Sequence, residues 1–399
     1  MNKLISIIIK IFFLLCFFIS FAINIETWNW GMQMSWVFAF LIIILLGIIE
    51  LKLTFPVNPV FTLLRFFLAF SFLDALLFWV GLIKPNIDSN YDIRRLIAHT
   101  CYIFIFLLIC KSLYNFFREK SFQKIIVYQN YLTIYPFIII GTYGTYQLLS
   151  TYNLVPYTDI FNNSLSTGFT YYRFVDDHRI SSVFAEPSEY SYYLCFIIPI
   201  LYRYIRSKKS NIIFKKIILS LLVVQIIFVK SLTFLIGFPI DILIIIIFIE
   251  RLNIYKIIRL GLVALTGILG IVYISWDRIE KIISNEDGSV SDRTRDFLST
   301  IDLFKNNIYS GFGYGGIRGM DGVSFLLASF GIIGTIIIFI IIYRILHRIF
   351  IYDKVISLSI FSMILSSLSS NNIFDYVFIW ILLLYYYILS VKYQNINLK

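Results

Sequence analysis

Long apolar runs recur along the whole 399-residue chain, separated by shorter polar segments. A run of about 20 apolar residues is long enough to cross a hydrocarbon layer of about 30 Å as an α-helix. We count twelve such runs, which predict twelve transmembrane helices. Their expected limits are about 4–23, 32–50, 60–82, 95–111, 125–149, 187–205, 212–229, 232–249, 255–275, 323–343, 354–370 and 373–391.

Two polar segments, 150–186 and 276–322, are much longer than the others. Of the 34 Lys and Arg residues, 21 fall in the short segments on one side of the predicted membrane, and 4 fall in the short segments on the other side. Short cytoplasmic segments carry the excess of Lys and Arg, whereas long loops are weak topology signals. We therefore expect both termini in the cytoplasm and both long loops outside it.

The composition agrees with this pattern, because 59% of the residues are hydrophobic and only 14% are charged. We expect an all-α polytopic membrane protein whose residues 1–399 form a single domain within the lipid bilayer. The net charge of +11 is spread over short loops, so nucleic acid is not an expected partner. No GxxxxGK[ST] motif and no long cytoplasmic segment is present, which excludes a built-in ATPase.

The four cysteines all fall inside predicted spans and show neither CxxC nor Cys/His spacing, so we expect no disulfide and no zinc. No cofactor is expected. Several polar residues also fall inside spans, where they are costly unless they are paired or face a cavity. Arg65 and Asp74 are about 13 Å apart along one helix and therefore need partners on other spans. The same holds for His99, Gln225 and Asp241.

The first long loop ends in the sequence RISSVFAEPSE, residues 179–189. Pro187 suits the first turn of a helix, so Glu186 should lie at the helix entrance, where the positive end of the helix dipole favours an anion. An ordinary capped helix end would look the same. An active centre is favoured because five titratable groups fall within the seven positions 173–179: Arg173, Asp176, Asp177, His178 and Arg179.

The second long loop contains an amphipathic pattern followed by a glycine-rich run. Ser289 to Asp292 reads as a capping box, and the following residues predict a helix to Asn306 that lies along the membrane surface. Its apolar face should carry Phe297, Ile301 and Phe304, and another face Arg295, Ser299 and Asp302. Residues 311–322 then hold six of the 19 glycines, whose exposed N–H groups could cradle a phosphate. A dinucleotide fingerprint is excluded, because no strand precedes the run.

Taken together, these features resemble the Wzy-type polymerases of O-antigen and capsular repeat units. The resemblance rests on about twelve spans, two large outer loops, RISSVFAEPSEYS at the start of a span, and an arginine-containing helix followed by SGFGYG. It implies a GT-C-related helical fold in the bacterial cytoplasmic (inner) membrane, without a metal or other cofactor. The implied reaction joins undecaprenyl-diphosphate-linked oligosaccharides on the outer face, and a chain-length regulator is the implied protein partner.

The positions that match this family are Arg179, Glu186 and Pro187 in the first loop and Arg293, Arg295, Gly311 and Gly313 in the second. A polyprenyl-diphosphate donor is already activated, so the protein must supply a cationic clamp and a base. Arginine suits the clamp because it binds phosphate oxygens in pairs, which adds Arg173 and Arg318 as candidates. Arg293 and Arg295 cannot both face one ligand on an ideal helix.

Two residues are candidates for the base. The motif favours Glu186, whereas the unperturbed pKa of histidine, near 6.5, favours His178.

Two other functions stay open. O-antigen ligases share long outer loops with functional Arg and His, and His178 keeps that alternative. A flippase or other transporter of the same lipid would be expected to show repeat symmetry, short loops and charges at mid-membrane. The concentration of charge in two unequal outer loops favours chemistry at the membrane surface.

Overall fold

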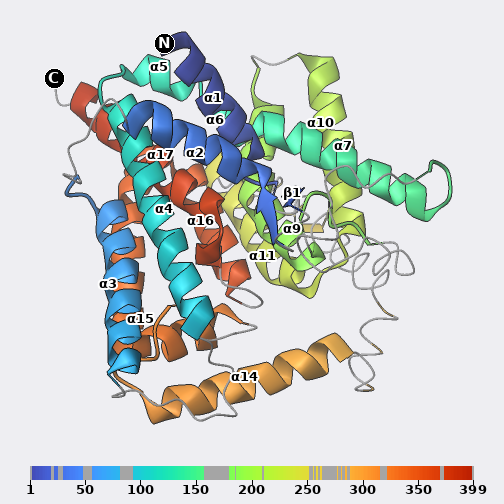
Figure 1. Ribbon diagram of the computed structural model, residues 1–399. Helices are drawn as coiled ribbons and strands as arrows, with labels where there is room; N and C mark the ends of the chain where they lie inside the picture. Colours follow the sequence, from blue (N-terminus) through green and yellow to red (C-terminus); the bar gives the residue numbers. More distant parts are fainter. Residues whose placement is uncertain are drawn as a thin grey trace.

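The computed structural model is a helical bundle with one short β-hairpin (Figure 1). It describes residues 2–18, 22–25, 30–47, 56–80, 93–156, 179–184, 186–208, 211–250, 288–314, 321–368 and 373–397, together with seven isolated positions between 255 and 284. Within these residues, five helical stretches are long and apolar enough to cross a membrane. They are Pro59–Leu77, Leu96–Arg118, Phe122–Thr151, Gly322–Tyr352 and Val377–Ile396.

The elements follow the predicted apolar runs closely. Every predicted run contains helical positions, but within 255–275 the structure describes only residues 255, 258, 261 and 262. In chain order the elements are α1 (Asn2–Leu15), β1 (Ala22–Ile25), β2 (Trp30–Gln33), α2 (Met34–Gly47), α3 (Pro59–Trp79), α4 (Ile93–Arg118), α5 (Phe122–Ile126), α6 (Gln129–Leu132), α7 (Ile134–Thr151), α9 (Pro187–Arg206), α10 (Ile212–Phe228), α11 (Leu232–Ile244), the π-helix η2 (Ile245–Ile249), α14 (Gly288–Asn306), α15 (Gly322–Tyr352), α16 (Lys354–Ser367), the 3-10 turn η3 (Ile373–Asp375) and α17 (Val377–Asn397).

Two predicted connections differ in detail. The residues between the first two runs form an antiparallel hairpin in place of an irregular loop, with Ala22 opposite Gln33. The fifth run is divided into α5, α6 and α7. At the first break the carbonyl of Ile125 accepts the hydroxyl of Tyr385 at 2.8 Å and the N–H of Tyr128 at 2.9 Å, so it is bonded in a turn. The total of twelve spans and the GT-C relationship stay predictions.

Helix α9 lies at the centre of the bundle. Every residue from Pro187 to Leu201 is buried, and α9 packs against α10, α11 and α16. A helix that is covered on all sides needs apolar or internally bonded side chains all round. The motif that begins α9 therefore leads from the loop directly into the core.

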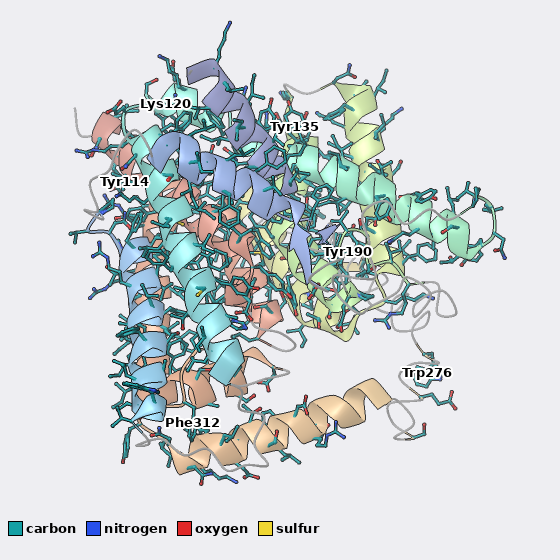
Figure 2. The ribbon with its side chains drawn as sticks, in the orientation of Figure 1. Tyr114, Lys120, Tyr135, Tyr190, Trp276 and Phe312 are labelled. Atoms are coloured by element: carbon teal, nitrogen blue, oxygen red, sulfur yellow. The ribbon has the colours of Figure 1, made fainter. Side chains whose placement is uncertain are left out.

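The two ends of the bundle differ in charge. The end that carries both termini is called the basic end, because Arg118, Lys120, Arg203, Lys215, Lys354 and Lys392 gather there. Lys120 and Tyr114 mark it in Figure 2, and Arg203 joins Asp353 there through two hydrogen bonds of 2.7 Å. The opposite end, called the loop end, carries Phe312 beside α14. The second predicted outer loop contains α14 at this end, whereas the first leads into α9 near Tyr190, at the middle height of the molecule (Figure 2).

Helix α14 runs across the loop end, beneath α3 and α4 (Figure 1), as the capping-box pattern predicts. Its inner side differs from the predicted apolar face. Thr300 and Leu303 are buried, and Leu303 with Phe304 packs against the start of α15, whereas Phe297 is 42% exposed. The reason is the crossing with α15, which covers only the second half of α14 and leaves Phe297 outside the contact.

Candidate functional site

The first motif has the predicted local geometry. Helix α9 begins at Pro187, and Glu186 is its extended N-cap residue, with φ of −134° and ψ of 153°. The Glu186 carboxylate accepts the hydroxyl of Ser188 at 3.0 Å and does not cap a helix N–H group. Glu186 is half-buried, so part of it faces the loop end.

The residues just before Glu186 form a buried turn. Ile180, Ser181, Ser182, Val183 and Phe184 are all at most 2% exposed. Ser182 has a positive φ of 52°, and its backbone N–H and carbonyl both bond to the side-chain amide of one glutamine in α7, Gln147, at 2.7 and 3.1 Å. The half-buried Arg179 is therefore attached to a rigid support and not to a free loop.

A second buried amide lies beneath this turn. The Nε2 group of Gln225 in α10 donates to the carbonyl of Gly141 at 2.9 Å and to the hydroxyl of Thr145 at 3.1 Å. Its Oε1 atom accepts the hydroxyl of Tyr190 in α9 at 2.9 Å. These bonds supply the partners on other spans that the sequence requires for Gln225. They also join α7, α9 and α10 directly behind the motif.

Of the glycine run, residues 311–314 are described at its start, and residues 315–320 lie outside the described part of the chain. The N–H groups of Gly311, Phe312 and Gly313 are bonded to the carbonyls of Asn307, Ala328 and Ser329, at 3.1, 2.8 and 2.9 Å. They are therefore not open to a phosphate. Gly311 and Gly313 have φ of 71° and 89°, and a Cβ atom on Gly311 would lie 2.4 Å from the Ser329 carbonyl carbon. These glycines permit close backbone packing on α15.

The two motifs meet at η3. Tyr314, which follows Gly313, donates its hydroxyl to Oδ1 of Asp375 at 2.6 Å. Tyr376, the residue after Asp375, donates its hydroxyl to Oε1 of Glu189 in the first turn of α9. Burial, reinforced by Glu189, raises the pKa of Tyr376, which precedes the span Val377–Ile396, well above its ordinary value. Adjacent residues of one turn thus contact both motifs.

A histidine from α4 completes this group. Nδ1 of His99 lies 3.0 Å from Oδ1 of Asp375, the same oxygen that Tyr314 contacts. The side chains of His99 and Asp375 are 18% and 32% exposed, respectively. Asp74 of α3 lies beside Gly313 and is buried, and its Oδ2 atom has no hydrogen-bond partner within the described part of the chain. We call His99, Tyr314, Asp375, Tyr376 and Glu189 the η3 cluster.

The sequence alone did not single out most of this cluster. His99 was expected to need a partner, but Glu189, Tyr314, Asp375 and Tyr376 were not selected. A signal was present, because the polar stretch Ser369–Asn372 and Asp375 interrupts two apolar runs. Nothing in the spacing indicated that this break would lie beside residues 189 and 314.

The remaining predicted site residues are placed less fully. Arg173, His178 and Arg318 lie outside the described residues. Arg293 belongs to α14, but its side chain lies outside the described part. The side chain of Arg295 is 75% exposed, and its guanidinium lies 3.9 Å from the Asp296 carboxylate.

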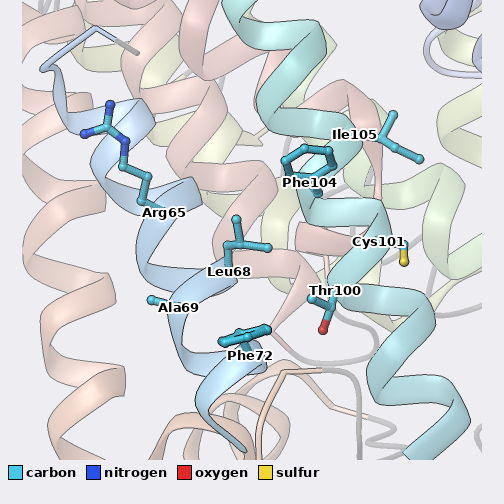
Figure 3. Close-up of a pocket in the computed structure, with 8 residues that line it drawn as sticks. All are labelled: Arg65, Leu68, Ala69, Phe72, Thr100, Cys101, Phe104 and Ile105. Carbon is cyan, nitrogen blue, oxygen red and sulfur yellow. The ribbon is translucent and has the colours of Figure 1, made fainter. Parts of the chain in front are cut away.

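An apolar groove of about 770 Å³ lies between α3 and α4 (Figure 3). Arg65 lies at one end, where its guanidinium donates to the carbonyl of Pro56 at 3.3 Å, and Phe72 and Thr100 lie toward the other. Leu96, one helical turn from Thr100, lies 3.0 Å from the position of a Cβ atom on Gly313. The end of the groove at Phe72 and Thr100 is therefore the end nearer to Gly313. Its lining consists of Arg65, Leu68, Ala69, Phe72, Thr100, Cys101, Phe104 and Ile105.

Comparison with known proteins adds no relative: no family model matches this chain, and no curated protein is significantly similar to it.

Proposed function

We propose that this chain is a membrane glycosyltransferase that polymerises undecaprenyl-diphosphate-linked oligosaccharide repeat units on the outer face of the bacterial cytoplasmic membrane. One observation carries the proposal. The two segments that resemble the Wzy-type polymerases join through η3. From the positive-inside rule we infer that the basic end faces the cytoplasm and that α14, at the opposite end, lies on the outer side.

The chemistry of the loop end suits an activated lipid-linked donor. The leaving diphosphate carries the bond energy, so the protein needs only to bind it, to orient the acceptor and to accept a proton. Arg179 is the proposed diphosphate clamp, because a buried turn fixes its backbone and its guanidinium can bind two phosphate oxygens. Arg173, Arg293, Arg295 and Arg318 remain further candidates for the clamp.

The α3/α4 groove supports a lipid-linked substrate. Its lining is apolar apart from Arg65, Thr100 and Cys101, and its far end approaches Gly313. A polyprenyl tail in this groove would place its diphosphate near the η3 cluster. Arg65 lies toward the basic end, where its guanidinium donates to the carbonyl of Pro56. Arginine side chains near helix ends in membranes commonly extend in this way toward the interface.

The O-antigen ligase reaction is the second candidate. Ligases share functional histidine and arginine at the outer face, and the partly exposed His99 at the loop end is an observation in favour of that reaction.

The glycan ladder from cells with this gene deleted separates the two candidates. A polymerase defect leaves single repeat units on the lipid acceptor. A ligase defect leaves long chains that are not attached to the acceptor. An unchanged ladder would contradict both, and accumulation of repeat units on the inner leaflet would instead indicate a transporter.

A further inference from the structure

His99 and Asp375 form a partly exposed dyad at the loop end. Asp375 Oδ1 accepts hydrogen bonds at 3.0 Å from His99 and at 2.6 Å from Tyr314. A carboxylate oxygen that receives two such bonds acts as an acceptor, which places the His99 proton on Nδ1. The lone pair then lies on Nε2. Imidazole held in this way is the usual arrangement of a general base.

The surroundings of the ring also fit this role. Within the described part of the chain, the titratable side chains in contact with His99 include Asp375 of η3, Tyr314 after the glycine run, and Tyr102 of its own helix. Tyr314 and Tyr102 both meet the ring edge to face, at centroid distances of 5.8 and 5.9 Å. These rings limit the rotation of the imidazole while its exposed fraction of 18% leaves room for a hydroxyl group.

We propose that His99 is the general base of the reaction and that Asp375 is its positioning residue, in place of Glu186 and His178. This inference rests on the proposed glycosyl transfer. The oxygen of the acceptor hydroxyl forms a bond to the anomeric carbon of the donor, and its proton moves to Nε2 of His99. The bond from that carbon to the diphosphate oxygen breaks, and the polyprenyl diphosphate leaves with the electron pair.

Glu186 has a different setting. Its carboxylate accepts the hydroxyl of Ser188 at the start of α9, where the positive end of the helix dipole favours the charged carboxylate. Replacing Glu186 by Gln keeps the side-chain shape and an acceptor oxygen. Under this proposal Glu186→Gln retains most of the polymerisation rate.

A purely structural dyad would give other results. If His99 and Asp375 only tied α4 to η3, Asp375→Asn would be tolerated, because the amide oxygen can accept the same two hydrogen bonds. As a base, His99 needs the negative charge of Asp375 to stabilise the imidazolium and to fix the tautomer. The Asp375→Asn variant therefore separates the two roles.

The experiment uses the full-length purified protein in liposomes with the lipid-linked repeat unit extracted from a strain that lacks this gene. His99→Gln should lower the initial polymerisation rate by about 10² to 10⁴. Asp375→Asn should lower it and move the acid limb of the pH–rate profile to lower pH. His347→Gln is the matched control, because His347 is exposed toward the basic end of α15 and should leave the rate unchanged.

Three results would overturn the proposal. The first is a His99→Gln polymerisation rate within threefold of the parent rate. The second is an Asp375→Asn enzyme whose rate and pH–rate profile equal those of the parent, and the third is an inactive Glu186→Gln enzyme together with an active His99→Gln enzyme. If the His99→Gln protein does not reach the membrane in normal amount, the rate and pH–rate profile of Asp375→Asn decide whether His99 is the base. Absence of polymerisation by the parent protein would instead contradict the proposed function.

Discussion

Replacing Gln147 by leucine tests whether the buried turn positions the first motif. The Gln147 amide bonds to both backbone groups of Ser182, and both residues are 0% exposed. Leucine has a similar size but no polar atoms. The change therefore removes two hydrogen bonds from the turn without altering any charged residue of the proposed site.

The expected cost follows from these contacts. Each buried backbone group left without a partner costs about 1–3 kcal/mol, so two cost about 2–6 kcal/mol. The leucine side chain recovers about 1–2 kcal/mol by apolar burial, which leaves about 1–4 kcal/mol for local opening of the turn. Since about 1.4 kcal/mol corresponds to a factor of ten, the open state should become about 5-fold to about 10³-fold more populated.

Hydrogen–deuterium exchange measures this opening directly. The amide of Ser182 and the amide of Ile180, which donates to the Phe228 carbonyl at 3.0 Å, should both exchange faster by that factor. Polymer chain length should fall in the same variant, because Arg179 loses its fixed support. Gln123→Leu, at an exposed position of α5, is the matched control and should change neither measurement.

Exchange of both amides within threefold of the parent would refute the reasoning. It would mean that the apolar packing of Ile180 and its neighbours holds the turn, and that the Gln147 bonds contribute little. Faster exchange with unchanged chain length would show that the turn opens but does not position Arg179.

Three other predictions concern the clamp, the topology and the glycine run. Arg179→Lys should keep partial activity because the charge remains, whereas Arg179→Ala should lose nearly all of it, at equal protein abundance; equal activity in the two variants would exclude a clamp. A cysteine introduced at Ser284 should react with an impermeant reagent in intact cells, and reaction only after permeabilisation would place that loop inside. Gly311→Ala should destabilise the protein by about 2–5 kcal/mol, because Gly311 has a positive φ and a Cβ atom there would clash with Ser329. The control Gly261→Ala should not lower the melting temperature, because a Cβ atom at that position meets open space. Similar melting temperatures for the two variants would contradict the packing role of Gly311.

Much of the fold follows from local patterns. Runs of apolar residues determine the helices, and Pro187 determines the start of α9, because these signals lie within a single element. The inner face of α14 could not be obtained in this way. It depends on where α15 crosses, and the crossing buries Thr300 and leaves Phe297 outside.

The candidate site was predicted only in part. Glu186 at the helix entrance was correct, since the motif carries its own geometry. For residues 311–313 of the glycine run, the N–H groups bond to the carbonyls of Asn307, Ala328 and Ser329, which no local pattern encodes; the phosphate cradle in the rest of the run lies outside the described residues. The pairing of His99 with Asp375 joins residues 276 positions apart. Such a pair depends on the packing of α4 against α17.

The arrangement of η3 has a consequence for the order of binding. Asp375 and Tyr376 are neighbours in one turn, and the Trp380 indole, which donates to the Phe374 carbonyl at 2.9 Å, restrains that turn. A rotation of this turn that strains the hydrogen bond between Tyr314 and Asp375 must also strain the hydrogen bond between Tyr376 and Glu189. We therefore predict that, in the proposed polymerase, binding at one motif changes the free energy of binding at the other, and that the effect is reciprocal.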